Sequence, residues 1–254
     1  MSDKHYDISY LEGTASILKK LKEYSYNPFT AILKGTVLEL GCGTGIDAIN
    51  LGNLLGKEVK IVGIDHDSRM IDKAISAAAD NENVEFILSE ASPIPFEDAT
   101  LSGIRTERLI QHLKEPQKVI NEAYRVLKPG QPLVIVETDW SNLSFYNADT
   151  AIEEKVSRYL TDEKINNGRA ARQLTGYLEK AEFKNIKLEV FPFALKSLKE
   201  VFTYLLIDQS LTEMKSKGYL NAEEYDSFIA SLQRADSNHY FACSMNLVVA
   251  SALK

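Results

Sequence analysis

The chain has 254 residues, of which 44% are hydrophobic and 26% are charged, a composition typical of one large globular domain or of a domain with a sizeable insertion. Its formal net charge of −7 and its lack of a basic run disfavour binding to a nucleic-acid backbone. No apolar run approaches the roughly 20 residues of a membrane helix, and the polar N-terminus has no signal-peptide core.

Hydrophobic periodicity predicts that strands and helices alternate along the first part of the chain, after an amphipathic helix at residues 8–22. The predicted strands cover residues 37–40, 59–65, 84–88, 101–106 and 133–136, and the predicted helices between them cover 44–55, 70–79 and 116–126. Alternation of helices with apolar strands favours a parallel sheet that is covered by helices on both faces.

The second part of the chain is more helical. The pattern is irregular and helical over residues 140–182, and it is followed by a strand at 184–193, helices at 197–217 and 222–234, and a last strand at 240–251. We therefore divide one domain, 1–254, into an N-terminal helical lid (1–34), a ligand-binding core (35–139), helical cap insertions (140–182 and 195–236) and final strands (183–194 and 239–254). The cap is interpreted as covering one rim of the sheet.

The most informative segment is the glycine-rich turn that follows the first strand. Residues 37–45 read Val-Leu-Glu-Leu-Gly-Cys-Gly-Thr-Gly, and glycines in such a turn let a ligand approach the main chain closely. The helix that follows points its free N–H groups and its positive end toward that ligand. We assign Gly41, Cys42 and Gly43 to a ligand site, with Cys42 serving packing. The alternative is a plain strand–turn–helix whose glycines serve packing alone.

The chemistry of this turn distinguishes between two ligand classes. A dinucleotide fingerprint reads G-x-G-x-x-G, and here Ile46 stands at the position of the third glycine. Glu39 would also repel a pyrophosphate, whereas it suits a ligand with a positive centre. Both features argue against a nicotinamide-dependent dehydrogenase.

In this form the turn resembles motif I of the class I S-adenosylmethionine-dependent methyltransferases, and further stretches between residues 36 and 139 match the same family in order and spacing. The nearest type is the branch that includes the ubiquinone/menaquinone-biosynthesis methyltransferases. The resemblance implies an α/β, Rossmann-like fold: a seven-stranded, mostly parallel sheet with an antiparallel last strand, helices on both faces and a helical cap. It also implies S-adenosylmethionine as cofactor, S-adenosylhomocysteine as product, and Glu39 as part of the cofactor site.

Asp65 ends the second predicted strand, about 20 residues after the glycine turn, where an acidic residue can accept hydrogen bonds from both hydroxyls of a ribose. The alternative is a helix-capping carboxylate, but Asp67 and Ser68 can fill that role. We assign His66 and Met70, which follow, to the same cofactor site.

The loop after the third strand contains Glu90 and Ala91 and continues as Ser-Pro-Ile-Pro-Phe. It resembles the loop in small-molecule methyltransferases where an acidic residue meets the adenine amino group. Many members of the family have aspartate where this chain has Glu90. A solvated, proline-containing loop is the alternative.

The segment after the fourth strand corresponds to the one that borders the methyl donor in the family. The resemblance implies that the Thr106 carbonyl accepts from the cofactor's ammonium and that Gln111 contacts the cofactor. We interpret Glu107 and Arg108 as a local ion pair. His112 is the candidate general base, because histidine exchanges protons near neutral pH. The alternative is a structural histidine that bonds the backbone.

The acceptor site is less clearly marked. Trp140, with Phe145 and Tyr146, would form the wall of an aromatic or apolar pocket, or else pack inside the cap. Tyr10 would contact substrate from the N-terminal lid.

A basic pair lies further along the chain. Arg169 and Arg172 lie on one helix face and would hold a substrate carboxylate or phosphate, or else form surface ion pairs.

These features together predict transfer of a methyl group to an oxygen, nitrogen or carbon atom of a small-molecule acceptor, by direct displacement between aligned reactants. The alternatives are a methyltransferase-fold protein that binds the cofactor without turnover, and an RNA methyltransferase. Cys42 and Cys243 are far apart and the histidines lack metal-ligand spacing, so we expect a cytoplasmic protein without a metal. We expect no nucleic-acid partner, no membrane span, and a monomer or homodimer.

Overall fold

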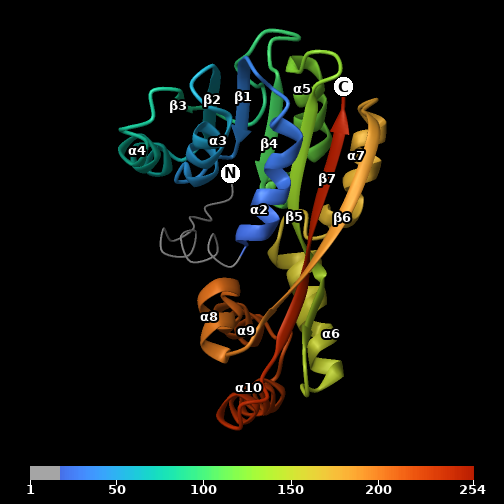
Figure 1. The fold of residues 1–254 in the computed structure, drawn as a ribbon. Helices are drawn as coiled ribbons and strands as arrows, with labels where there is room; N and C mark the ends of the chain where they lie inside the picture. Colours follow the sequence, from blue (N-terminus) through green and yellow to red (C-terminus); the bar gives the residue numbers. More distant parts are fainter. Residues whose placement is uncertain (1–17) are drawn as a thin grey trace.

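The computed structural model describes residues 18–254, and within them a seven-stranded sheet has the order β3-β2-β1-β4-β5-β7-β6 (Figure 1). The strands are β1 (Gly35–Leu40), β2 (Val59–Asp65), β3 (Val84–Leu88), β4 (Gly103–Glu107), β5 (Pro132–Phe145), β6 (Lys184–Leu195) and β7 (Cys243–Leu253). Of these strands only β7 runs opposite to the others, and it lies between β5 and β6. The predicted fold class is confirmed.

Helices cover both faces of the sheet and also form a separate group beyond one of its ends. The α-helices are α2 (Lys19–Tyr26), α3 (Ile46–Leu55), α4 (Ser68–Ala77), α5 (Pro116–Val126), α6 (Thr150–Tyr159), α7 (Ala170–Lys180), α8 (Leu198–Leu205), α9 (Ile207–Ser216) and α10 (Ala222–Ser237). Short helical turns are η1 (Asn27–Phe29), η2 (Ile110–His112) and η3 (Leu160–Lys164).

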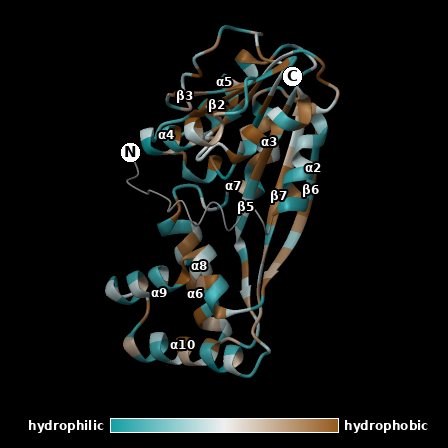
Figure 2. Cartoon of the chain, turned by 60° about the vertical axis from the view of Figure 1, so that its left-hand side comes forward, coloured by the Kyte–Doolittle hydropathy of each residue, from teal (hydrophilic) through white to brown (hydrophobic). Residues whose placement is uncertain are grey.

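Two layers of buried side chains hold these helices against the sheet. On one face, α5 and α7 pack on strand residues such as Leu38 and Ile135. On the other face, α2 and α3 pack on residues such as Val37 and Ile61. Leu38 and Val37 are neighbours in one strand, so their side chains point to opposite faces, and a strand buried on both sides reads as a continuous apolar run. Figure 2 shows these hydrophobic strands between the helices.

A third buried cluster lies in the cap lobe, which we define as α6, η3, α8, α9 and α10 with the adjoining ends of β5, β6 and β7. Its members include Phe145, Val201, Leu211, Phe228 and Met245. Figure 1 shows this lobe at the far end of the long strands β5, β7 and β6.

One expectation for the cap was wrong, because residues 140–145 are not helical. They continue β5, and Phe145 at its end pairs with Cys243 of β7. The local sequence, Trp-Ser-Asn-Leu-Ser-Phe, carries polar residues that are typical of turns. The antiparallel partner strand supplies the hydrogen bonds that keep it extended, and no local pattern reveals that partner.

The single helix expected at residues 197–217 is also corrected, because it is two helices, α8 and α9. Leu206 between them adopts φ +52°. Such a left-handed leucine is rare and no glycine or proline signals it. The break lets Val201 of α8 and Leu211 of α9 both reach the core of the cap lobe.

The N-terminal expectation is tested only in part, because Tyr10 and most of the helix expected at residues 8–22 lie outside the described residues. The described part begins as α2 at Lys19. Asp67 caps α4 as expected, since its side chain accepts from the Arg69 N–H at 2.9 Å. Among residues 18–254, no helix has the length and apolar character required to cross a membrane.

The glycine turn depends on close packing where α3 begins. Gly45 precedes α3 with φ +82°. A Cβ at Gly45 would lie 2.6 Å from Cζ of Phe86 and 2.8 Å from Cβ of Ala74. The third glycine therefore brings α3 against β3 and α4, in addition to providing a left-handed backbone.

We predict that Gly45→Ala costs about 3 kcal/mol or more, the sum of left-handed strain and crowding. Gly218→Ala is the matched control, because Gly218 has φ +78° but open space where its Cβ would be. It should cost only about 1 to 2 kcal/mol. Urea unfolding of both variants measures the difference, and equal losses would show that crowding at Gly45 has no effect.

Candidate functional site

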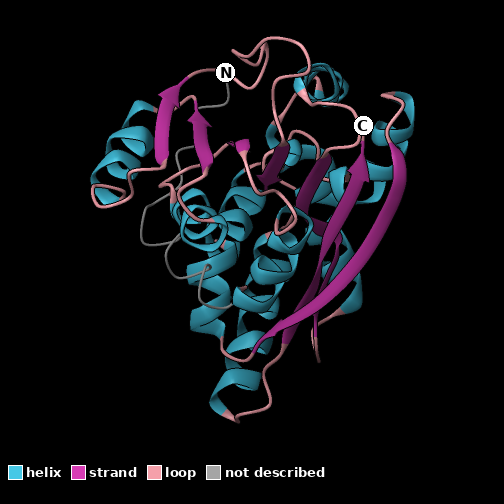
Figure 3. Ribbon diagram, turned by 45° about the horizontal axis from the view of Figure 1, so that its top comes forward, coloured by secondary structure: helices cyan, strands magenta, loops and turns pink. Residues whose placement is uncertain are grey.

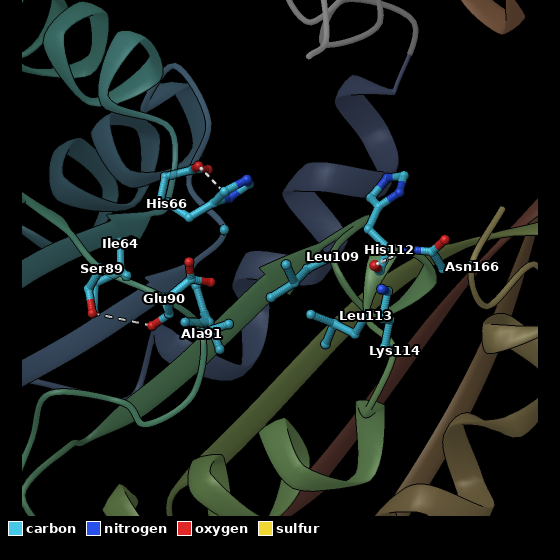
Figure 4. Close-up of a pocket in the computed structure, with 13 residues that line it drawn as sticks. Ile64, His66, Ser89, Glu90, Ala91, Leu109, His112, Leu113, Lys114 and Asn166 are labelled. Carbon is cyan, nitrogen blue, oxygen red and sulfur yellow. Dashed lines mark hydrogen bonds and ion pairs between the residues drawn. The ribbon is translucent and has the colours of Figure 1, made fainter. Parts of the chain in front are cut away.

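The candidate site lies at the carboxyl ends of β1, β2 and β4, where the strand order reverses direction from β1. A cavity of about 190 Å³ opens there (Figure 4). In open α/β sheets such a rim beyond the switch in strand order is the usual ligand-binding place.

Six residues expected at the site line this cavity, from four different segments of the chain. They are Gly41, Asp65, His66, Glu90, Ala91 and His112. Figure 4 shows His66 and Glu90 on one side of the space and His112 across from them. The fold thus brings together the ends of β1 and β2, the loop after β3 and the turn after β4.

Other expected residues are buried and do not line the cavity. Glu39 and Thr106 are buried within their strands, Met70 is buried in α4, and Gln111 is buried next to His112. Cys42 is buried in the glycine turn, and burial raises the pKa of its thiol above the usual range, which fits packing.

Several lining residues were not among the expected ones. Leu109, Leu113 and Lys114 belong to the segment after β4 that already stood out, so their position was a readable signal. Asn166 comes from the cap, and nothing in the local sequence marks it.

The Asp65 carboxylate is oriented by the main chain. Its Oδ2 accepts from the Gly43 N–H at 2.8 Å, and its Oδ1 accepts from the Asp67 N–H at 3.0 Å. The Gly43 amide is therefore engaged by a carboxylate, which disfavours a phosphate in the turn. Oδ2 keeps a further lone pair, whereas Oδ1 also has His66 Nδ1 at 3.4 Å, so Asp65 is arranged to accept hydroxyl hydrogens from a ligand first through Oδ2.

Beneath the turn lies a buried ion cluster, defined as Lys22, Glu39, Asp47, Arg105 and Glu107. Arg105 is fully buried, and its Nη1 lies 2.6 Å from Glu39 Oε1 while its Nη2 lies 2.5 Å from Glu107 Oε2. Lys22 Nζ of α2 lies 2.6 Å from Asp47 Oδ2 and 3.0 Å from Glu107. The cluster joins β1, β4, α2 and α3.

The cluster holds three carboxylates, Glu39, Asp47 and Glu107, and two cations, Lys22 and Arg105, while Arg108 lies at its edge, 3.6 Å from Glu107. Burial raises the pKa of Glu39 above its usual range, against the pull of Arg105. Burial acts on Asp47 too, but Arg105 and Lys22 outweigh it and hold the pKa of Asp47 well below its usual range. Glu39 is thus the carboxyl of the cluster that takes a proton most readily.

This arrangement refines the expectation for Glu39. The cation that it contacts in the structure is Arg105, from the neighbouring strand. Its second oxygen, Oε2, is buried and has no hydrogen-bond partner among the described residues. The expected Glu107–Arg108 pair is confirmed at 3.6 Å, although Lys22 and Arg105 are closer partners of Glu107.

A hydrogen-bond chain defines the state of His112. The Trp140 indole N–H, which can only donate, lies 2.8 Å from Gln111 Oε1 and so fixes the orientation of that amide. The amide nitrogen of Gln111 then faces His112 Nε2 at 3.0 Å. His112 Nε2 must accept this hydrogen bond, so its lone pair is engaged by Gln111.

Glu137 clamps the segment that carries His112. Its Oε1 accepts from the Ile110 N–H at 2.6 Å and from the Gln111 N–H at 3.4 Å, and the whole side chain is buried. Burial raises the pKa of Glu137 to about 8, although the two amides oppose the rise.

Asn166 and Asn167, which follow η3, hold the same turn from the other side. Asn166 Nδ2 donates to the His112 carbonyl at 2.8 Å, and the Asn167 N–H donates to the Gln111 carbonyl at 2.9 Å. Movement of this segment would therefore move His112.

The residues expected to bind the acceptor do not line the cavity. Trp140 is buried and packs in the cap core, whereas Tyr146 is exposed. Arg169 pairs with Asp162 at the surface, with Nη2 3.0 Å from Oδ1. Tyr10 lies outside the described residues. The cavity described above therefore includes five of the eleven residues expected to bind the cofactor, and none of the described residues expected to bind the acceptor.

A family model described as "Methyltransferase domain" matches residues 34–186. A protein from Streptomyces fradiae, described as "Uncharacterized 37.1 kDa protein in transposon TN4556", is 27% identical over 248 residues, which cover 97% of this chain and 71% of that protein. Demethylmenaquinone methyltransferase from Lactococcus lactis is 30% identical over 113 residues, which cover 44% of this chain and 45% of that enzyme. This chain thus matches less than half the length of the Lactococcus enzyme.

Among solved structures, phosphoethanolamine N-methyltransferase 2 from Haemonchus contortus, in complex with S-adenosyl-L-methionine, superposes with a TM-score of 0.58. The match has 17% identity and covers 92% of this chain and 52% of that chain. At this identity the likeness concerns the fold.

We predict that Arg105→Leu destabilises the protein by about 3 to 5 kcal/mol, because it leaves buried carboxylates without their main counter-ion. Glu39→Gln is the matched comparison and should cost about 1 kcal/mol or less, since a neutral amide replaces a carboxyl that readily takes a proton. Urea unfolding followed by circular dichroism measures both. Equal losses would contradict the charge assignment within the buried ion cluster.

We also predict that Glu137→Gln reduces the dependence of stability on pH. Between the ordinary carboxyl pKa of 4.5 and about 8, native Glu137 holds a proton that the unfolded chain has lost. The native state therefore loses stability as pH rises through this window.

The wild-type loss of unfolding free energy between about pH 5 and about pH 8.5 should exceed that of Glu137→Gln by at least about 1.4 kcal/mol, the equivalent of one pKa unit. Glu97→Gln, a change at an exposed carboxyl, serves as control. A pH profile of Glu137→Gln that matches the wild type would contradict the prediction.

Proposed function

The chain belongs to the methyltransferase-domain family, and from this premise we propose that it transfers the methyl group of S-adenosylmethionine to an oxygen, nitrogen or carbon atom of a small-molecule acceptor. The observation that carries the proposal is the Asp65 carboxylate, which is oriented by the Gly43 amide at the wall of the cavity. The Asp65 carboxylate can accept hydrogen bonds from ligand hydroxyls. In a dinucleotide site, free main-chain amides of the turn would instead bind a phosphate.

The chemistry of the cavity fits the nucleoside part of this cofactor. Asp65 would accept from the ribose hydroxyls, and Glu90 would accept from the adenine amino group. Apolar walls from Ile64, Leu109 and Leu113 suit a flat base. Gly41, Cys42, Gly43, His66, Met70 and Ala91 belong to the same proposed cofactor site.

The methionine end of the cofactor would lie toward the glycine turn and the end of β4. S-adenosylmethionine, when bound, supplies a methyl group that its sulfonium makes electrophilic. The protein's own contribution is to orient the reactants and exclude water, and the proposal requires no metal. Glu39, Thr106 and Gln111 would support this end from buried positions, where Glu39 Oε2 has no partner among the described residues.

Proton removal is needed only where the acceptor is a hydroxyl or a protonated amine. His112 is then the proposed base, because it lines the cavity. Its Nε2 lone pair is engaged by Gln111, so the Gln111 amide would have to turn away when the acceptor binds. For an acceptor that is already nucleophilic, His112 serves as a wall of the site and no base is required.

The remaining features of the proposal concern the whole chain. We propose that residues 1–254 form one methyltransferase domain, in which the N-terminal segment with Tyr10 and the cap, with Trp140, Tyr146 and Arg169, select the acceptor. A small-molecule acceptor fits the net charge of −7 better than RNA does. Cys42 and Cys243 are both unpaired and buried, which fits the reducing cytoplasm.

Binding of S-adenosylhomocysteine tests the proposal. At about 100 times its dissociation constant it should stabilise the protein by about 2.7 kcal/mol and raise the Tm by about 5 to 11 °C. NAD should cause no shift. Asp65→Ala should weaken S-adenosylhomocysteine binding by at least about tenfold in isothermal titration, since it removes the acceptor of the ribose hydroxyls.

Asp67→Ala is the matched control for Asp65→Ala, because it also removes a carboxylate that accepts a main-chain N–H nearby but leaves the cavity wall intact. It should retain the wild-type affinity. Unchanged affinity of Asp65→Ala would refute the ribose assignment, and a shift with NAD alone would refute the cofactor. Tight cofactor binding without methyl transfer to any acceptor would favour a binding protein that lacks turnover.

A further inference from the structure

β6 forms one edge of the sheet, far from the cofactor cavity. It runs from Lys184 to Leu195 and pairs with β7 along one side (Figure 3). Its other side pairs with no strand among the described residues. A long edge strand presents a row of unpaired N–H and C=O groups, which can pair with another chain.

Pro192 indicates which main-chain groups of β6 point outward. Proline has no N–H, and within sheets it is found where the missing donor would face solvent. Because main-chain groups alternate in direction along a strand, Leu188 and Val190 share the outward direction of Pro192. The outer side of β6 is therefore open to hydrogen bonding around Leu188.

The side chains of β6 separate into two different faces. Leu188 pairs with Ala250 and Val190 with Val248, both in the apolar layer shared with α7, yet Leu188 is 45% exposed and Val190 is 51% exposed. Ile186 packs against the same layer. Ile186, Leu188 and Val190 thus form an apolar row along this face of β6, and Leu188 and Val190 are only partly covered.

Opposite charges lie on the other face, which is the side of α2. Lys187 pairs with Ser251 and Glu189 with Val249, so the two side chains point to that face on either side of position 188. The pattern Lys-Leu-Glu is complementary to itself when it is read in the opposite direction.

We propose that β6 pairs antiparallel with β6 of a second copy of this chain, about a two-fold axis at Leu188. In this register Lys187 lies opposite Glu189 of the second copy, and Val190 lies opposite Ile186. Each charge pair and each apolar pair occurs twice by symmetry. The two sheets become one continuous sheet, and the exposed apolar row is covered by its own copy.

The ends of the ladder agree with this register. Pro192 falls opposite Lys184, which precedes the irregularity between Lys184 and Lys187 in the pairing of β6 with β7. Pro192, which has no N–H to donate, therefore lies opposite the end of the partner strand where regular pairing has already stopped. An axis at Val190 would instead place Pro192 opposite Leu188 in the middle of the ladder and Lys187 opposite Phe193.

Charge exchange tests the interface. Analytical ultracentrifugation of the full chain should give twice the chain mass of 28.4 kDa. Lys187→Glu or Glu189→Lys should each raise the dissociation constant of the dimer by about tenfold or more, because two attractive pairs become repulsive. The double exchange, Lys187→Glu with Glu189→Lys, should restore the dimer, whereas Lys34→Glu, an exposed change away from β6, should not affect it.

Cysteine cross-linking tests the position of the axis independently of affinity. Leu188→Cys should form an intermolecular disulfide under mild oxidation, because opposed Cα atoms in a hydrogen-bonded pair lie about 5.5 Å apart. Val190→Cys should not, because it faces Ile186 of the second copy. The native Cys42 and Cys243 are buried and should stay inert.

A monomer at all concentrations, a dimer that the exchanges leave unchanged, or cross-linking through Val190→Cys would each overturn the proposal. Circular dichroism of each variant identifies any loss of fold. The dimer can fail while S-adenosylhomocysteine still binds, so the result is separate from the proposed function.

Discussion

The buried guanidinium of Arg105 is the constraint on which the glycine turn and the neighbouring strand ends depend. A cation taken out of water must be paired, and its partners come from three places: Glu39 on β1, Glu107 on its own strand, and Asp47, 3.5 Å away at the start of α3. Lys22 then ties α2 to the same carboxylates. The same ion pairs therefore fix the position of β4 beside β1 and the packing of α2 and α3 on the sheet. The glycine turn follows β1 directly and depends on this arrangement.

A second set of contacts positions the turn after β4, which forms part of the wall of the cavity. Glu137 holds its main chain from the sheet side, Trp140 orients Gln111, and Asn166 bonds the His112 carbonyl. In a methyltransferase the alignment of donor and acceptor supplies much of the rate, so a rigid wall that fixes the reactants is more useful than a strong base. Trp140 packs in the core of the cap lobe and also donates to Gln111 in the turn after β4. It therefore links the cap lobe, which would select the acceptor, to the wall of the cavity.

Much of this arrangement could be predicted from local patterns. The glycine turn, the acidic end of β2 and the loop after β3 follow strands that alternate with helices, and parallel strands bring their carboxyl ends to one edge. The predictions were weaker where a partner distant in sequence decides the outcome. Arg105 lies within a predicted strand, but its role required Lys22 and Asp47, which are 83 and 58 positions away in the chain. The continuation of β5 to Phe145 and the break at Leu206 likewise depend on packing in the cap lobe.

The sequence by itself determined the fold class, the family and six of the residues that line the cavity, because hydrophobic periodicity and a glycine turn are properties of neighbouring residues. Only the tertiary structure decided the partner of Glu39, the engagement of the His112 lone pair and the burial of Trp140. These depend on which distant side chains are brought within hydrogen-bond distance in a medium without water. Patterns among neighbouring residues can be recognised in the sequence, whereas contacts between distant residues are set only when the helices pack on the sheet.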